Sequence, residues 1–145
     1  MSQFIALTGN VHVAGQISIT DIDDAKTQGI TMIINNRPDG EADDQPVNAD
    51  LAAYAMEKGV KWATIPVAGA FPLEAIEMMA SALKSAEGPV LAFCRTGTRS
   101  THLWALAEAM NKNLSAPDLV EAAKKGGYNI SSLTPTLEHL YMMNA

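Results

Sequence analysis

The chain has a single cysteine, few basic residues and no long hydrophobic run, and each shortage excludes a class of protein. One cysteine among 145 residues excludes an internal disulfide, and it leaves no second thiol to relieve an oxidised or persulfidated cysteine. No segment approaches the roughly 18 consecutive apolar residues of a membrane span. Residues 1–9 also lack the basic region and long apolar run of a signal peptide. We therefore expect a protein of the reducing cytoplasm that has no membrane partner.

Basic residues are outnumbered by acidic ones. Ten Lys and Arg against 16 Asp and Glu give a net charge of −6 and a pI near 4.9. An acidic surface argues against nucleic acid or an anionic membrane as a partner, because both are negatively charged. A single cysteine and the absence of a histidine pair at ligand spacing disfavour a metal site. Because no nucleotide-binding glycine motif is present either, we expect no metal and no cofactor.

Apolar, β-branched segments alternate with helical patterns along the chain. Strands are predicted at residues 11–14, 30–35, 60–67 and 90–93, and helices at 21–28, 49–58, 72–86, 100–111, 115–125 and 134–143. Alternating strands and helices predict an α/β fold in three layers, with a mainly parallel central sheet covered by helices on both faces. The length and an apolar content of 48% predict one domain over residues 1–145.

The segment from Pro89 to Ser100 carries most of the functional information. The apolar strand 90–93 is followed by Cys94, by a turn that contains Gly97 and two arginines, and by the helical pattern that starts at Ser100. Backbone N–H groups of such a loop point inward, and the helix N-terminus adds partial positive charge, so the loop can cradle an anion. A cysteine at the mouth of this cradle is expected to ionise readily. The nucleophile and the anion site would then coincide, just past the carboxyl end of a central strand.

Seven residues of this loop form the candidate site. Cys94 and Arg99 are the expected catalytic residues, the first as nucleophile and the second as the cation that closes the loop over the anion. The expected substrate-binding residues are Arg95, Thr96, Gly97, Thr98 and Ser100. Gly97 would permit a positive φ and close approach of the ligand. Ser100 is expected either to cap the helix or to donate to the Cys94 thiolate, and Arg95 to face substrate or solvent.

Several segments outside the loop resemble a known family. The order of elements, the segment Gly29–Pro38, the strand end Ile65–Val67 and the segment Gly88–Leu91 look like a dual-specificity phosphatase domain. More closely, the chain is similar over roughly residues 5–140 to the phosphatase-like domain of bacterial beta-lactamase-hydrolase-like proteins. The resemblance implies a cysteine-phosphatase fold, with Cys94 as the nucleophile and Arg99 as the anion binder.

The cysteine loop departs from the phosphatase signature. That signature has His before the Cys and Arg six positions after it, whereas here Phe93 precedes Cys94, Arg99 stands five positions after it and Ser100 takes the usual Arg place. Phosphatases of this kind also carry an Asp general acid after the Ile-Pro-Val strand, where residues 68–71 hold no carboxylate. Over about ten residues, the loop is instead similar to that of single-domain rhodaneses, which move sulfane sulfur.

Two enzyme mechanisms and one binding role therefore stay open. In the favoured mechanism, Cys94 takes sulfane sulfur from thiosulfate or a persulfide, and an external thiol relieves the Cys94 persulfide without a general acid. In the alternative, Cys94 attacks a phosphoester as a protein-tyrosine or dual-specificity-type phosphatase, through a Cys94 phosphoenzyme. Asp39, Asp43 or Asp44 of the polar loop 36–46 would then be the candidate acid. A binding or redox-sensing module could use the same loop.

A few residues outside the loop receive structural roles. We expect Arg37 to pair with Asp39 and His102 to be a partly buried structural histidine. Phe71 is expected to line the mouth of the pocket. Helix 100–111 is expected to pack one face on the sheet, the face formed by Leu103, Leu106, Ala107 and Met110.

Overall fold

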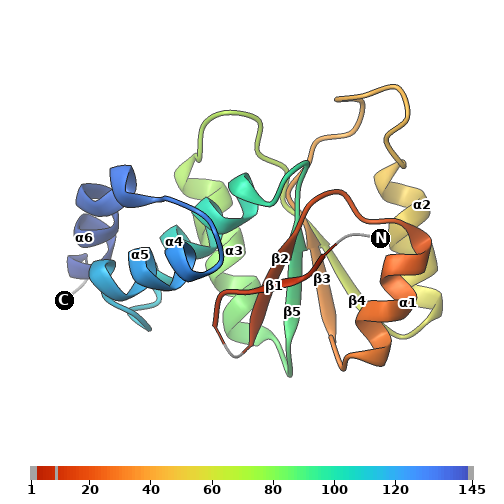
Figure 1. Cartoon of the computed structure of the whole chain (residues 1–145), viewed down its shortest axis with the longest axis horizontal. Coiled ribbons are helices and arrows are strands. Elements are labelled where there is room, and N and C mark those ends of the chain that lie inside the picture. Colours follow the sequence, from red (N-terminus) through yellow and green to blue (C-terminus); the bar gives the residue numbers. More distant parts are fainter. Residues whose placement is uncertain (1–2, 9, 144–145) are drawn as a thin grey trace.

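The computed structural model describes residues 3–8 and 10–143. They form a five-stranded sheet with the strand order β1-β2-β5-β3-β4 (Figure 1). The strands are β1 (Ile5–Ala6), β2 (Val11–Ala14), β3 (Met32–Asn35), β4 (Lys61–Thr64) and β5 (Val90–Phe93). Strands β1 and β2 are antiparallel, and the other neighbouring pairs are parallel. The sheet is mainly parallel, as predicted, and the short edge strand β1 is an addition that the sequence pattern did not indicate.

Helices cover both faces of the sheet, which confirms the three-layer α/β fold (Figure 1). Helices α1 (Ile19–Thr27) and α2 (Asn48–Glu57) lie on one face. The other side holds α3 (Leu73–Ser85), α4 (Thr98–Met110), α5 (Ala116–Lys125), the short 3-10 helix η1 (Ser131–Leu133) and α6 (Thr134–Met142). No helix in the described part of the chain is long and apolar enough to cross a membrane.

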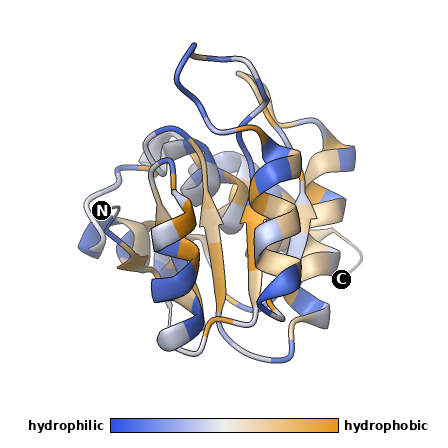
Figure 2. Ribbon diagram, turned by 90° about the vertical axis from the view of Figure 1, so that its right-hand side faces the viewer, coloured by the Kyte–Doolittle hydropathy of each residue, from blue (hydrophilic) through white to orange (hydrophobic). Residues whose placement is uncertain are grey.

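The central position of strand β5 in the sheet explains why its sequence is apolar at every residue. Successive side chains of a strand point to opposite faces of the sheet. Accordingly, Leu91 and Phe93 enter the core beneath α1 and α2, whereas Val90 and Ala92 enter the core beneath α3 and α4. All four are buried, and the strands stand out as mostly hydrophobic ribbons inside the molecule (Figure 2). A central parallel strand covered on both faces has no position at which a polar side chain would meet water.

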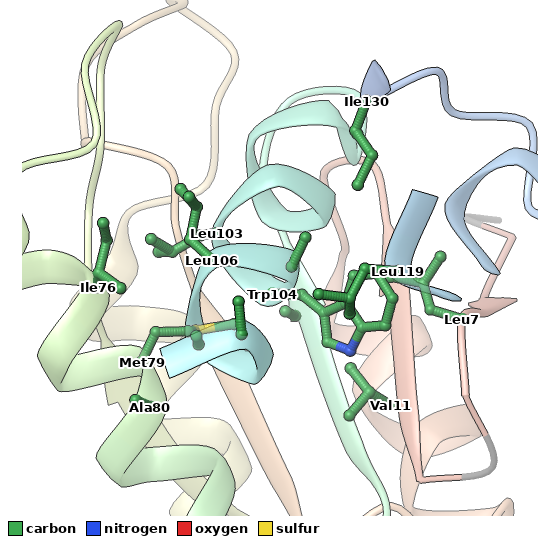
Figure 3. Close-up of a cluster of buried hydrophobic side chains, with 14 of the residues drawn as sticks. Leu7, Val11, Ile76, Met79, Ala80, Leu103, Trp104, Leu106, Leu119 and Ile130 are labelled. Atoms are coloured by element: carbon green, nitrogen blue, oxygen red, sulfur yellow. The ribbon is translucent and has the colours of Figure 1, made fainter. Parts of the chain in front are cut away.

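Helix α4 is buried on more sides than its sequence pattern predicts. Nine of its 13 residues are buried, instead of the single apolar face that we expected. The reason is that α3, α5 and α6 pack around it. Figure 3 shows Leu103 and Leu106 of α4 facing Ile76 of α3, while Trp104 lies toward Leu119 of α5. The helix that follows the cysteine loop is therefore held in place along most of its length.

Helix α1 begins earlier than expected. The predicted helix starts at residue 21, which would make Thr20 its N-cap, but α1 starts at Ile19 and its N-cap is Ser18. The Oγ of Ser18 accepts a hydrogen bond from the Asp21 N–H at 3.3 Å, and the Asp21 carboxylate accepts one from the Ser18 N–H at 2.9 Å. This reciprocal capping box satisfies two otherwise free donors, so it outweighs the single cap that Thr20 would give.

The chain segments that follow the parallel strands meet at one edge of the sheet. The Cys94 N–H donates to the Ala14 carbonyl at the end of β2 at 3.3 Å, and the Asn36 N–H donates to the Phe93 carbonyl at 2.8 Å. The Val67 N–H in turn donates to the Asn36 carbonyl at 3.0 Å. The cysteine loop, the loop that starts at Asn36 and the segment after β4 are thereby brought together at the carboxyl edge.

Candidate active site

Cys94 lies at the centre of this edge, directly after β5. Its side chain is fully buried, and its Sγ accepts a hydrogen bond from the Gly97 N–H at 3.1 Å. A backbone donor aimed at sulfur stabilises negative charge there, as does the N-terminus of a helix. The structure thus brings together the strand, the loop and the helix start that the sequence predicts around Cys94.

Gly97 is the N-cap of α4 and adopts φ +91°, in the left-handed region that favours glycine. Helix α4 therefore starts at Thr98, two residues before the predicted start at Ser100. A Cβ added to Gly97 would lie only 2.2 Å from the Tyr128 Oη. Glycine is required here both by the backbone angle and by the close approach of a tyrosine.

Tyr128 closes over the cysteine loop from the segment after α5. Its hydroxyl donates to the Thr96 carbonyl at 3.1 Å. Burial raises the pKa of Tyr128 above its usual value, and the negative charge of Cys94 raises it further. The phenol therefore stays protonated at neutral pH and keeps its role as a donor.

Ser100 does not cap the helix, so that prediction was wrong. It lies inside the first turn of α4, because the left-handed Gly97 lets the helix begin two residues earlier. Its hydroxyl donates to the Asn36 Oδ1 at 2.8 Å, and the Asn36 amide donates to the Ile65 carbonyl at 2.9 Å. Both side chains are fully buried. This pair connects α4 to the ends of β3 and β4, and the Ser100 hydroxyl donates to Asn36 and not to the Cys94 thiolate.

Arg99 is held by an acidic residue of the 36–46 loop. Its Nη1 and Nη2 donate to the two carboxylate oxygens of Glu41, each at 2.8 Å, and Nη1 also donates to the Val67 carbonyl at 2.8 Å. The Glu41 carboxylate raises the pKa of Arg99, and the negative charge of Cys94 adds to the shift. The guanidinium is thus fixed by Glu41 and by the Val67 carbonyl.

Arg37 pairs with Glu41 and not with Asp39, so that prediction was also wrong. The Arg37 Nε donates to Glu41 Oε1 at 2.9 Å, while Nη1 donates to the Gln16 Oε1 at 3.0 Å. Asp39 instead accepts a hydrogen bond from the Asn48 N–H at 2.9 Å, which turns its carboxylate toward the start of α2. Arg37 is only 5% exposed. Its guanidinium therefore pairs with Glu41, whose carboxylate reaches it, and not with Asp39, whose carboxylate is turned toward α2.

Glu41 is ionised because two arginines face it. The hydrogen bonds from Arg99 lower its pKa the most and those from Arg37 add to the effect, so the pKa falls from 4.5 to about 2 although partial burial opposes the shift. Such a carboxylate carries no proton at neutral pH. Sequence reasoning considered three aspartates of this loop and missed Glu41 and Asn36. For Asn36, the available signal was a polar residue directly after a buried strand.

The remaining loop residues lie at the surface above Cys94. Arg95, Thr96 and Thr98 are exposed, and the Thr96 hydroxyl donates to the Thr98 hydroxyl at 3.1 Å. The Arg95 carbonyl accepts a hydrogen bond from the Gln16 N–H at 3.2 Å, which fixes the backbone while leaving the side chain at the surface. These exposed groups are available to an incoming anion.

His102 and Phe71 lie beside the start of α4. Their ring centroids are 5.6 Å apart, and partial burial lowers the pKa of His102, so the imidazole is neutral at physiological pH. Neither residue supplies a carboxylate where a phosphatase would have its acid. In the part of the chain that the structure describes, no three His, Cys, Asp or Glu side chains gather closely enough to hold a metal ion.

The mainly parallel sheet, with a buried cysteine directly after its central strand and a helix that follows the next turn, is a phosphatase-like α/β fold. Solved structures share this fold. A candidate phosphatase from Neisseria meningitidis is 28% identical, with a TM-score of 0.79 over 94% of this chain and 96% of that one. PTPMT1 is 14% identical, with a TM-score of 0.70 over 96% of this chain and 94% of that one, a likeness that shows the fold alone.

Residues 3–111 match the family described as "Beta-lactamase hydrolase-like protein, phosphatase-like domain", and the chain belongs to this family. The Beta-lactamase hydrolase-like protein of Agrobacterium fabrum is 35% identical over 135 residues, which cover 92% of this chain and 31% of that protein. Its counterpart in Xylella fastidiosa strain 9a5c is 28% identical over 137 residues. The chain thus spans about a third of the length of these curated relatives. The family resemblance inferred from the sequence is confirmed.

Proposed function

We propose that the protein is a cysteine-dependent phosphatase that acts on small phosphate monoesters with acidic leaving groups. The observation that carries the proposal is the Cys94 Sγ, 3.1 Å from the Gly97 N–H and beside Arg99, in a protein of phosphatase-like family and fold. The family and fold favour phosphate hydrolysis over sulfur transfer, which the loop sequence alone had favoured. Membership of a fold does not fix a reaction, because the reaction depends on the residues of the site.

The reaction would proceed in two displacements. The Cys94 thiolate attacks phosphorus, the ester P–O bond breaks, and the leaving oxygen departs with the bonding electrons. Water then attacks the Cys94 phosphoenzyme, which releases inorganic phosphate and restores the thiolate. Arg99 would neutralise the charge that the equatorial oxygens gather in each transition state.

The loop would supply the contacts to the phosphoryl group. The Gly97 N–H bonds to the Cys94 Sγ, other backbone N–H groups of the loop would bind the phosphoryl oxygens, and the exposed Thr96 and Thr98 hydroxyls and the Arg95 side chain would line the entrance. Ser100 would contribute through its backbone N–H, because its hydroxyl is already bonded to Asn36.

The state of Glu41 limits the substrates. Its pKa of about 2 leaves it without a proton, and residues 68–71 carry no carboxylate. General acid catalysis is worth roughly 10²- to 10⁴-fold when a poor leaving group must be protonated. We therefore expect aryl or acyl phosphates, whose leaving groups are stable as anions, to be favoured over alkyl phosphates.

Sulfur transfer is the second candidate, and it needs no proton donor, so the ionised Glu41 and the lack of a carboxylate in residues 68–71 do not hinder it. The Cys94 thiolate would attack the outer sulfur of thiosulfate, the S–S bond would break, and sulfite would leave as an anion without needing a proton. A thiolate acceptor would then attack the outer sulfur of the Cys94 persulfide and restore the Cys94 thiolate. The acceptor must be an external thiol, because the chain has no other cysteine.

The test compares three substrates with wild type and Cys94→Ser. Phosphate release from an aryl phosphate that vanadate inhibits, that is much slower with an alkyl phosphate and that Cys94→Ser abolishes would support the proposal. Thiocyanate formation from thiosulfate and cyanide, without phosphate release from either ester, would assign the site to sulfur transfer instead. Aryl phosphate hydrolysis that persists in Cys94→Ser would refute the phosphatase mechanism through Cys94, and thiocyanate formation that persists in this variant would refute sulfur transfer through Cys94.

A further inference from the structure

Glu41 meets Arg99 in the way that an oxyanion substrate would. Its two carboxylate oxygens lie 2.8 Å from Nη1 and Nη2, in a bidentate arrangement. The guanidinium fork binds carboxylates and phosphates with this same geometry. To Arg99, the Glu41 carboxylate is therefore equivalent to two oxygens of a bound phosphate.

Arg99 does not depend on Glu41 alone for its position. Its Nη1 also donates to the Val67 carbonyl at 2.8 Å, a backbone group fixed by the hydrogen bond between the Val67 N–H and the Asn36 carbonyl. The Glu41 side chain, in contrast, belongs to the polar loop 36–46 and is 27% exposed. Arg99 can thus keep its place while its carboxylate partner is exchanged for another anion.

Glu41 would keep a second cationic partner, Arg37, after such an exchange. Its Oε1 accepts a hydrogen bond from the Arg37 Nε at 2.9 Å, and Arg37 is nearly fully buried. Leaving Arg99 would therefore not strand the carboxylate without a partner. This lowers the free energy needed to open the site, because a charge that keeps one hydrogen-bonded partner avoids most of the penalty of isolation.

We propose that Glu41 is a built-in competitor that occupies the anion position on Arg99 until a substrate anion displaces it. The inference rests on the proposed anion site but not on which reaction follows there. A competitor of this kind lowers the apparent affinity of every anion by the same factor, the fraction of protein in which the position is vacant. Only anions with strong contacts of their own to the loop would then remain bound at low concentration.

Two other roles for Glu41 predict different results when the side chain is neutralised. If Glu41 served to position Arg99, its loss would weaken anion binding. If it acted only through its negative charge, its loss would help a doubly charged anion more than a singly charged one, and any nearby acid would do the same. Competition alone predicts tighter binding by an equal factor for both kinds of anion.

The experiment is an NMR titration that follows the Gly97 amide, with inorganic phosphate and acetate as the two probes. The proteins are wild type, Glu41→Gln and the matched control Asp43→Asn, which removes the same charge from an exposed position of the same loop. We expect Glu41→Gln to bind both probes about fivefold more tightly than wild type, the scale of a partly exposed ion pair. Asp43→Asn should stay within about twofold of wild type on the same scale.

Several outcomes would overturn the inference. These are equal or weaker binding by Glu41→Gln, a clearly larger gain for phosphate than for acetate, a matching gain in Asp43→Asn, and no binding by any variant. None of these results involves turnover, so the proposed function is tested separately by the aryl phosphate assay. If the protein hydrolyses the aryl phosphate but Glu41→Gln does not bind the anions more tightly, only the competitor role of Glu41 would be refuted.

Discussion

The cysteine loop and the 36–46 loop meet at the same edge of the sheet, but they are fixed in different ways. The first is held by consecutive backbone geometry: the Gly97 N–H bonds to the Cys94 Sγ, and α4 begins at once. The second is a polar surface segment, and its Glu41 carboxylate accepts hydrogen bonds from Arg99 of the first loop. This difference underlies the two proposals, in which the first loop is a rigid anion cradle and the second provides an exchangeable charge.

The largest effect should come from removing the arginine that joins the two loops. We expect Arg99→Ala to lower kcat/KM for an aryl phosphate by about 10²- to 10³-fold, because it deletes the charge that stabilises the transition state. Arg95→Ala is the matched variant, since it removes an exposed arginine from the same loop. Its loss should be at most about tenfold, the scale of a surface charge. Equal losses in the two variants would contradict a special role for Arg99.

The next effect contrasts one glycine from each loop. Gly97 and Gly40 both have positive φ, +91° and +79°, but only a Cβ at Gly97 meets a neighbour, the Tyr128 Oη at 2.2 Å. We expect Gly40→Ala to lower the free energy of unfolding by about 1 kcal/mol, through backbone strain alone. Gly97→Ala should lower it by about 3 kcal/mol, since overpacking adds to the strain. Urea unfolding measures both values.

A second substitution isolates the steric part of the destabilisation caused by Gly97→Ala. Tyr128→Phe removes the hydroxyl that the new Cβ would strike, together with its hydrogen bond to the Thr96 carbonyl. Gly97→Ala should therefore be about 1 kcal/mol less destabilising in a Tyr128→Phe background than in wild type. Additive effects of the two substitutions would show that the tyrosine is not the obstacle.

The smallest effect concerns the exchangeable charge and depends on pH. The pKa of Glu41 is lowered from 4.5 to about 2 in the folded protein, so its ion pair contributes stability that is fully present above about pH 4.5. This contribution is lost as the pH falls from about 4.5 toward 2. Because the pair is partly exposed, we expect Glu41→Gln to be less stable than wild type by only about 0.5–1 kcal/mol at pH 7.

Denaturant unfolding at pH 7, 5 and 3 measures this difference. The gap between wild type and Glu41→Gln should be similar at pH 7 and 5 and should shrink at pH 3, where the wild-type carboxylate begins to lose its advantage over the unfolded state. A gap that is unchanged at pH 3 would mean that Glu41 stabilises the fold through packing and not through its charge.

The cysteine loop could be predicted because its geometry depends on residues that are adjacent in the sequence. An apolar strand, a cysteine, a glycine and a helical pattern in succession define where the nucleophile lies. What the sequence could not give was the start of α4, because the left-handed conformation of Gly97 places the cap three residues before Ser100. The expected capping role of Ser100 was therefore wrong, because this residue lies inside the first turn of α4.

The 36–46 loop could not be predicted because its decisive contact is remote in the chain. Glu41 and Arg99 are 58 positions apart, and several other acidic side chains of the loop were equally plausible partners from the sequence. Only the meeting of three strand ends in space selects Glu41. For the same reason, the burial of α4 on most sides could not be seen from its own pattern, since α3, α5 and α6 supply the cover.

The role of Cys94 as the nucleophile can be tested by the intact mass of the protein during turnover. Wild type and Cys94→Ser are mixed with an aryl phosphate, quenched in acid within milliseconds to seconds, and then digested to locate any adduct. The account predicts one added phosphoryl group on the peptide that contains Cys94, in wild type only. No adduct on Cys94, together with hydrolysis that continues in Cys94→Ser, would contradict the assignment of Cys94 as the nucleophile.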